Sequence, residues 1–268
     1  MLIVKVPGIN GLGKTNGCER AGDAIINALH DIHMNEQGKE IDVKKLDLEE
    51  IHLDNKNLEL SNKLIYKNAF ECFEDYPKVI FLGGDHSISY SLTRAFLDYC
   101  ETNNKTPCLI VFDAHADLMP SMSEPTHEEW LRRLIEEGFP TENILLIGSR
   151  NFHKTEKKFI EENKIKVISM SSLLEDLQGV ADSITEFANK KELYVSIDID
   201  VVDPSMAPST GYIEPGGLSV RQFLYILQRI NKIKSLHGLD IVEINEMKDK
   251  EKDLMTIKLG AKIVAEVV

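Results

Sequence analysis

Along this chain, short runs of apolar and β-branched residues alternate with longer stretches in which apolar residues return every three or four positions. A short apolar run bounded by polar or turn-forming residues predicts a buried strand, and the longer periodicity predicts an amphipathic helix. The predicted strands cover Leu2–Val6, Ile41–Leu46, Lys78–Leu82, Cys108–Phe112, Ile144–Gly148, Lys166–Ile168, Leu193–Ile197 and Leu236–Ile244. The predicted helices cover Arg20–His30, Leu58–Phe73, Ser89–Tyr99, His127–Glu137, Glu156–Asn163, Ser171–Ala188, Ser219–Ile230 and Asp253–Glu266.

Strands that alternate with helices are typical of α/β proteins in which helices cover both faces of a parallel sheet. We therefore predict the α/β fold class, a three-layer sandwich with a mainly parallel sheet flanked by helices. No linker rich in Gly, Pro and Ser divides the 268 residues. The irregular segment 198–217 is better explained as a loop of a functional site than as a domain boundary. The chain is predicted to form a single domain, residues 1–268.

Three clusters of acidic residues and histidines follow three of the predicted strands. They are Gly83–Ser87 (GGDHS), Asp113–Asp117 (DAHAD) and Asp198–Pro204 (DIDVVDP). Ligands of open parallel sheets bind outside the carboxyl ends of the strands, which is where all three clusters fall. Because strand side chains alternate faces, we expect Asp113, His115 and Asp117 to point the same way, and likewise Asp198 and Asp200. The pattern predicts that the clusters form one site.

Carboxylates placed side by side repel one another and raise one another's pKa, a cost that divalent cations remove. The candidate ligands are His86, Asp113, His115, Asp117, Asp198 and Asp200. Two imidazoles and four carboxylates, without a thiolate, suit two hard-to-borderline metal ions that share bridging carboxylates. The residues alone therefore predict a dinuclear metal site.

The composition narrows the range of partners. The 44 acidic and 31 basic residues give a net charge of −13. The absence of a strongly basic face argues against nucleic acid as a partner, and the acidic excess favours a cationic substrate. The four cysteines have no CxxC spacing, which indicates reduced thiols in a cytoplasmic protein. No stretch approaches 18 apolar residues, so no membrane span is expected.

The three clusters, in this order and at these spacings, resemble the ureohydrolase family of arginases, agmatinases, guanidinobutyrases and formimidoylglutamases. The family pattern GGDHS, DAHxD and SxDxDxxDPxxxPxTG matches Gly83–Ser87, Asp113–Asp117 and Ser196–Gly211 without gaps. Ala207–Leu218 is similar to the agmatinase-like version of the loop, and Asp240–Asn245 resembles the family's late strand. The resemblance implies an arginase-like fold and spans roughly residues 78–245.

The resemblance also implies roles for individual residues. Two Mn²⁺ ions per chain would be held by His86, Asp113, Asp117 and Asp198 on one side and by His115 and Asp200 on the other, with Asp113 and Asp198 bridging. A metal-activated hydroxide would attack the guanidinium carbon and release urea and an amine. Glu243 would pair with the guanidinium, Thr210 would contact the substrate, and His127 would carry the proton to the leaving amine. Asp117 is included among the catalytic residues. In the family the equivalent of His127 is usually followed by Gly, and here Glu128 follows.

Two departures from the arginase pattern indicate the substrate. Leu118–Met122 is more apolar than in arginases, and Gly148–His153 lacks the acid that would meet an α-amino group. We therefore expect agmatine, a substrate of polyamine biosynthesis, ahead of guanidinobutyrate and arginine. Guanidinobutyrate would need Arg150, His153 or Lys154 to meet its carboxylate. The resemblance further implies a homo-oligomer, a trimer or hexamer.

Two other classes stay open on the sequence alone. One is a metal-dependent deacetylase, which normally uses zinc, and the other is a catalytically silent relative with a binding role. We interpret Asp85 as a group that orients His86 or caps the following helix, Asp203 as support for its loop, and Ser196 as support for the ligand strand. The isolated histidines, His153 among them, are interpreted as surface or packing residues.

Overall fold

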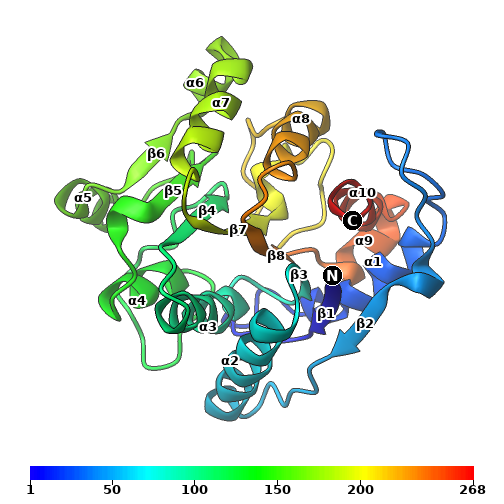
Figure 1. Ribbon diagram of the computed structural model, residues 1–268, viewed down its shortest axis with the longest axis horizontal. Coiled ribbons are helices and arrows are strands. Elements are labelled where there is room, and N and C mark those ends of the chain that lie inside the picture. Colours follow the sequence, from blue (N-terminus) through cyan, green and yellow to red (C-terminus); the bar gives the residue numbers. More distant parts are fainter.

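A computed structural model describes all residues, 1–268, and contains one sheet of eight strands in the order β2-β1-β3-β8-β7-β4-β5-β6 (Figure 1). Every neighbouring pair in this sheet is parallel. The strands are β1 Leu2–Val6, β2 Asp47–Glu50, β3 Val79–Gly83, β4 Pro107–Phe112, β5 Ile144–Ile147, β6 Lys166–Ile168, β7 Glu192–Asp198 and β8 Leu236–Val242. The α-helices are α1 Ala21–Leu29, α2 Leu58–Asp75, α3 Ile88–Thr102, α4 Trp130–Glu136, α5 Lys154–Asn163, α6 Met170–Glu175, α7 Leu177–Phe187, α8 Val220–Ile230, α9 Glu246–Asp249 and α10 Met255–Val267.

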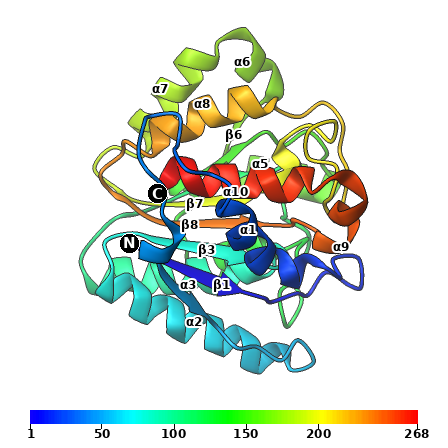
Figure 2. The ribbon, with the colours of Figure 1, turned by 90° about the vertical axis from the view of Figure 1, so that its right-hand side faces the viewer.

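Helices cover both faces of the sheet, as Figure 2 shows edge-on. A core of 41 buried residues lies between the sheet and α1, α7, α8 and α10, and a second core of 30 lies between the sheet and α2, α3 and α4. The central strands β3 and β4 are buried along their whole length, because both of their faces are covered. The predicted three-layer α/β fold with a parallel sheet is confirmed. None of the helices is both long and apolar enough to cross a membrane.

The predicted strand Ile41–Leu46 is wrong. Residues Val43–Lys45 form a 3-10 turn that the Asp42 carboxylate caps, and the strand that pairs with β1 is the acidic, exposed segment β2 (Asp47–Glu50). Ile41 and Val43 are buried because they pack into the first core, not because they belong to a strand. An edge strand is held by its backbone and needs no apolar face, so the apolar pattern pointed to the wrong residues.

The predicted helix Ser171–Ala188 is two helices. Asp176 has a non-helical backbone, which ends α6, and its carboxylate accepts a hydrogen bond from the Gly179 amide at the start of α7. An Asp in this position stabilises a helix N-terminus better than a helix interior, because its side chain competes for backbone hydrogen bonds. The chain turns here instead of continuing as one long helix.

The sheet order places the polar clusters side by side. Strands β3, β8, β7 and β4 are consecutive in the centre of the sheet, and their registers align Leu82 with Ile241, and Ile197 with both Ile241 and Phe112. Their carboxyl ends therefore finish at one level. The segments that follow these four strands begin at Gly84, Glu243, Ile199 and Asp113, and they form the site described next.

Candidate metal centre and substrate pocket

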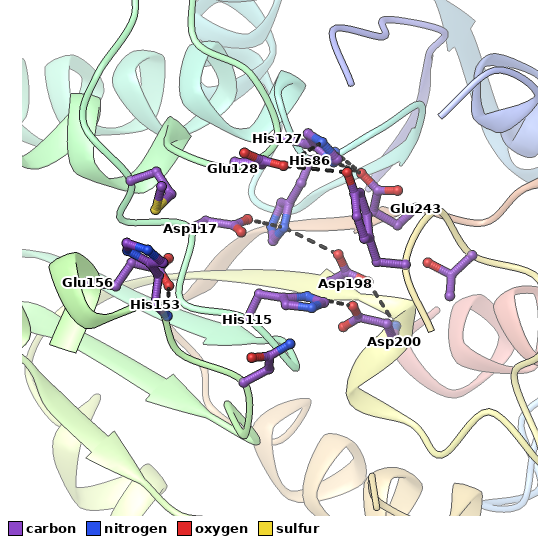
Figure 3. Close-up of a pocket in the computed structure, with 14 residues that line it drawn as sticks. His86, His115, Asp117, His127, Glu128, His153, Glu156, Asp198, Asp200 and Glu243 are labelled. Carbon is purple, nitrogen blue, oxygen red and sulfur yellow. Dashed lines mark hydrogen bonds and ion pairs between the residues drawn. The ribbon is translucent and has the colours of Figure 1, made fainter. Parts of the chain in front are cut away.

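The six predicted ligands converge at the carboxyl ends of β3, β4 and β7. Figure 3 shows five of them, all except Asp113. Asp113 lies between the two histidines: its Oδ2 is 3.0 Å from Nδ1 of His86, and its Oδ1 is 3.5 Å from Nδ1 of His115. Around His86, the carboxylates of Asp117 and Asp198 approach Nδ1 to 2.9 and 3.5 Å. Their ligand atoms form two compact groups, His86–Asp113–Asp198 and Asp113–His115–Asp200, that share Asp113. Two neighbouring cations that share a carboxylate fit this arrangement.

The expected reason for this convergence is wrong, although the grouping itself holds. Strand β4 ends at Phe112, and Asp117 has a left-handed backbone with φ of 51°, so strand alternation does not set its direction. Likewise β7 ends at Asp198, and Asp200 lies in the 3-10 turn Ile199–Val201. The side chains meet because two loops fold toward each other.

Backbone amides hold three of the carboxylates in place. Asp113 Oδ1 accepts from the His115 amide at 2.6 Å, and Asp198 Oδ1 accepts from the Asp200 amide at 2.8 Å. Asp200 Oδ1 accepts from the amide of Ala114 at 2.9 Å, which ties the loop after β7 to the loop after β4. Each of these carboxylates keeps its second oxygen directed at a histidine. Such fixed carboxylates have little freedom left to lose when a cation binds.

The buried carboxylates of this cluster repel one another when no cation is bound. Burial, and then the neighbouring Asp113, raise the pKa of Asp117 to about 7. Burial together with Asp200 and Asp113 also raises the pKa of Asp198 well above its usual range. Asp113 goes the other way: burial opposes its ionisation, but the two imidazoles that it faces, those of His115 and His86, lower its pKa. The ionised Asp113 carboxylate thus makes ionisation of the neighbouring carboxylates less favourable. Bound divalent cations would offset this repulsion.

A buried hydrogen-bond relay sets the orientation of His86. Ser196 Oγ donates to Asp240 Oδ1 at 2.7 Å, so the proton in the 2.9 Å contact between His86 Nε2 and Ser196 Oγ belongs to the histidine. Asp240 also accepts from the hydroxyls of Tyr194 and Ser89 at 2.8 and 3.0 Å. The relay leaves the Nδ1 lone pair of His86 facing carboxylates. Both Nδ1 and Asp113 Oδ2 are buried without a hydrogen bond, which a metal ion would satisfy.

Trp130 supports Asp117 from the opposite side. Its indole N–H donates to Asp117 Oδ2 at 2.8 Å, and its ring lies 4.7 Å from the ring of His86. Trp130 and the relay residues Tyr194 and Ser89 were not identified from the sequence, because they read there as ordinary core positions. The indole nitrogen is polar, and a polar group in such a core position needs a partner nearby.

Of the two roles expected for Asp85, orienting His86 or capping the following helix, the contacts support the second. Asp85 Oδ2 accepts from the Thr15 hydroxyl and from the Asn10 amide, both at 2.7 Å, and its Oδ1 accepts from the amide and hydroxyl of Ser87 next to helix α3. Asp85 therefore fastens the loop between β1 and α1 to the start of α3. Gly84 beside it has no room for a side chain, because a Cβ there would lie 1.7 Å from the carbonyl oxygen of Gly8.

Glu243 and His127 meet above the metal cluster. Glu243 Oε1 accepts from the His86 amide at 3.0 Å and lies 3.4 Å from Nδ1 of His127. Burial opposes protonation of His127, but its hydrogen bond to Glu243 raises the imidazole pKa to about 9. Glu243 has φ of 65°, an unfavourable backbone for this residue type, and its Oε2 is buried without a partner. His127 lies before α4, which begins at Trp130 and not at His127 as predicted.

These side chains line a pocket of about 220 Å³. The lining residues are His86, His115, Asp117, Met119, His127, Glu128, Asn151, His153, Glu156, Asp198, Asp200, Thr210, Tyr212 and Glu243 (Figure 3). The predicted Thr210 is among them, and its Oγ1 is buried without a partner. His153, interpreted as a surface histidine, also lines the pocket, and Tyr212 and Glu156 were not identified at all. His153 and Glu156 form the capping box at the start of α5, and Tyr212 comes from the distant loop after β7.

The pocket lining contains carboxylates and histidines but no lysine or arginine. Arg150 stands close by, but its guanidinium donates to the carbonyl oxygens of Gly148, Asp200, Glu214 and Pro215. The Lys248 ammonium likewise donates to the carbonyl oxygen of Thr210, at 2.8 Å. Arg150 is thus committed to backbone carbonyls of the loops after β5 and β7, whereas His153, also expected as a partner for a substrate carboxylate, lines the pocket.

Known proteins resemble this chain along its whole length. The sequence profile described as the arginase family matches residues 1–268. An arginase of Staphylococcus aureus is 29% identical over 243 residues, which cover 82% of this chain and 79% of that enzyme. An N(1)-aminopropylagmatine ureohydrolase of Thermus thermophilus is 31% identical over 190 residues, 70% of this chain but 61% of that enzyme, so the match spans less than two thirds of its length.

Solved structures give the same result. Proclavaminate amidino hydrolase from Streptomyces clavuligerus superimposes with a TM-score of 0.87 at 25% identity, over 99% of this chain and 89% of that one. Agmatine ureohydrolase of Thermoplasma volcanium superimposes with a TM-score of 0.84 at 25% identity, over 99% and 87%. The chain belongs to the arginase family, whose members are hydrolases that act on carbon–nitrogen bonds of guanidines and amidines.

Proposed function

We propose that residues 1–268 act as one ureohydrolase domain that binds two Mn²⁺ ions and cleaves agmatine to urea and putrescine. The observation that carries this proposal is the pair of His–Asp groups that share Asp113, lying beneath a pocket in which Glu243 Oε2 has no partner. Manganese suits ligands that are imidazole and carboxylate without thiolate.

The proposed ligands divide between two ions. His86, Asp113, Asp117 and Asp198 would hold one ion, and His115 and Asp200 the other, with Asp113 and Asp198 shared. The contacts of Asp113 support its shared role, because one oxygen approaches each histidine. Bound at these groups, two divalent ions would make water ionise near neutral pH.

Glu243 is proposed to hold the substrate guanidinium. Its free Oε2 lies beside Gly211, where a Cβ would stand 2.8 Å away, so Glu243 keeps an unobstructed oxygen at the pocket floor. A charge-assisted, two-point contact with a guanidinium would fix the position of the reacting carbon. Thr210 Oγ1, also buried and unpartnered, is a second contact for the same group.

His127 is proposed as the group that delivers a proton to the leaving amine. Its imidazole pKa, raised to about 9 by Glu243 against the effect of burial, keeps it protonated at neutral pH before substrate binds. Substrate at Glu243 competes for that carboxylate and weakens its hold on the imidazole proton. His127 Nε2 has no hydrogen-bond partner, so it is free to face the substrate.

The pocket favours agmatine over its two rivals. Arginine and guanidinobutyrate carry a carboxylate, which would need a cationic partner when removed from water. The lining offers no lysine or arginine, and Arg150 is engaged with backbone carbonyls. Met119 adds an apolar wall where a carboxylate would be costly. The relative that acts on N(1)-aminopropylagmatine, whose name describes a substituted agmatine, agrees with a preference for cationic tails.

The test is urea release from a panel of guanidino compounds, with purified protein loaded in turn with Mn²⁺ and Zn²⁺, and metal content measured in the same samples. We expect two manganese ions per chain, with agmatine the best substrate. Full activity with one zinc per chain would favour the deacetylase-like alternative. Two bound metals without urea from any compound would favour a catalytically silent relative.

We also propose that the chain assembles as a trimer or hexamer in the cytoplasm. The four cysteines are buried and unpaired, as is usual where thiols stay reduced. Large apolar side chains stand exposed in loops at the carboxyl edge of the sheet, among them Leu12, Met122 and Ile213, and neighbouring subunits could cover them. Light scattering at micromolar concentration tests the assembly, and a monomer would refute it.

A further inference from the structure

We propose that the Glu128 carboxylate and the Tyr212 ring form a subsite for a second cation of the substrate, an ammonium at the end opposite the guanidinium. This inference rests on the proposed function only in placing the guanidinium at Glu243. It assigns the residue that replaces the usual family Gly after His127 to substrate selection.

Glu128 is the one carboxylate of the pocket lining that is free for such a contact. Asp117, Asp198 and Asp200 belong to the metal groups, and Glu243 forms the floor. Glu156 is already used, because its two oxygens accept the amides of Leu118 and His153 at 3.0 and 2.8 Å. The Glu128 side chain is 42% exposed, and its one side-chain hydrogen bond, from the Tyr212 hydroxyl, is long at 3.4 Å.

The position of Glu128 relative to Glu243 fits a short dication. The His127 imidazole separates the two carboxylates: its Nδ1 is 3.4 Å from Glu243 Oε1, and its Nε2 is 3.9 Å from Glu128 Oε1. One carboxylate is buried at the floor and the other faces solvent at the mouth. A guanidinium and an ammonium joined by a few methylene groups can therefore contact one carboxylate each.

Tyr212 completes the subsite with an aromatic face. Its ring lies 5.3 Å from the ring of His127 and 6.1 Å from that of His115, so it extends from the metal groups to the mouth. The ammonium of Lys14 already lies 5.6 Å from its centroid, within the range of cation–π attraction. The ring thus accepts an ammonium in this surrounding. An aromatic face beside a free carboxylate is a usual combination for binding an alkylammonium.

The experiment compares agmatine with butylguanidine, which has the same chain length but no ammonium, and with 4-guanidinobutyrate. Urea release is measured with manganese-loaded wild type and Glu128→Gln. We expect the variant to lose about 10-fold in kcat/KM for agmatine, mainly through KM, and to stay within about 2-fold for butylguanidine. The discrimination against 4-guanidinobutyrate should shrink, because the repelling charge is gone. Glu142→Gln, which removes one exposed charge at the opposite edge of the sheet, is the matched control for net charge.

The outcomes separate this inference from the proposed function. Equal losses on agmatine and butylguanidine would overturn the subsite, because Glu128 would then act on the chemistry through His127. No loss on agmatine would overturn it too. Should wild type release urea from none of the compounds, the proposed function fails, and calorimetric binding decides the subsite on its own. In that case Glu128→Gln should weaken agmatine binding about 10-fold and leave butylguanidine binding unchanged, and any other result refutes the subsite.

Discussion

The floor and the mouth of the pocket are built in different ways. At the floor, the His86 side chain is 1% exposed and is held between the Ser196–Asp240 relay and three carboxylates. At the mouth, Glu128 is 42% exposed and has one long hydrogen bond. Floor residues follow the ends of central strands, whereas mouth residues stand on loops. The difference indicates that the floor fixes the type of reaction and the mouth selects the compound.

The floor differs from the mouth because backbone hydrogen bonds hold its carboxylates in addition to side-chain packing. The carboxylates of Asp113, Asp198 and Asp200 are each anchored by a backbone amide, so their direction does not depend on side-chain packing alone. The mouth lacks such anchors, with the exception of Glu156, whose carboxylate forms the capping box of α5. Substitutions at the floor should therefore impair every substrate, and substitutions at the mouth should change the ranking of substrates.

The largest effect is expected for Asp113→Asn. The substitution keeps the shape and removes the charge that faces both histidines, so metal content should fall below two ions per chain. Activity should fall for every guanidino compound by more than the roughly 100-fold that a supporting residue can cost. Metal analysis and urea release measure the two losses, with Asp203→Asn, in the loop after β7, as the control. Two bound ions with substantial activity would show that Asp113 is not shared.

The next largest effect is expected for Glu243→Gln, which should retain both metals. The variant loses a charge-assisted contact of about 1.5–3 kcal/mol, equivalent to roughly 10- to 150-fold in kcat/KM. Because the guanidinium is common to all candidate substrates, agmatine and butylguanidine should lose equally. That equality contrasts with the selective loss expected for Glu128→Gln. Wild-type efficiency in Glu243→Gln would remove Glu243 from the substrate site.

A smaller effect is expected for Asp240→Asn, which alters no proposed metal ligand. It disturbs the relay that fixes His86, so the manganese concentration needed for half-maximal activity should rise by about 10- to 100-fold. Saturating manganese should restore most of the turnover, a recovery that loss of folding would not allow. Tyr194→Phe removes one of the three hydroxyl donors to Asp240 and should give a smaller shift in the same direction. An unchanged manganese dependence in both variants would make the relay purely structural.

The contrast between floor and mouth also explains which parts of the site could be predicted from the sequence. The floor was predictable because its residues follow apolar strands in short contiguous clusters, and parallel strands bring their ends together. The direction of the Asp117 side chain was not predictable, because β4 ends at Phe112 and Asp117 itself has a left-handed backbone. Tyr212 and Glu128 could not be paired, because loops 84 residues apart meet only in the folded chain. Strand β2 was missed because backbone pairing at a sheet edge leaves no apolar pattern.

The smallest of these effects, and the one that depends most on the mouth, is the preference for agmatine over arginine. Arginine would bring an α-carboxylate beside Met119, with no lysine or arginine in the lining and with the nearby Arg150 committed to four carbonyl oxygens. Its α-amino group could still reach Glu128, so the cost falls on the carboxylate alone. This incompletely compensated carboxylate should lower kcat/KM for arginine at least about 10-fold relative to agmatine, or by about 1.4 kcal/mol. Parallel kinetics on both compounds with the manganese-loaded protein measure it. Arginine equal to or better than agmatine would show that the mouth provides a carboxylate partner in solution, while the assignment of the floor would stand.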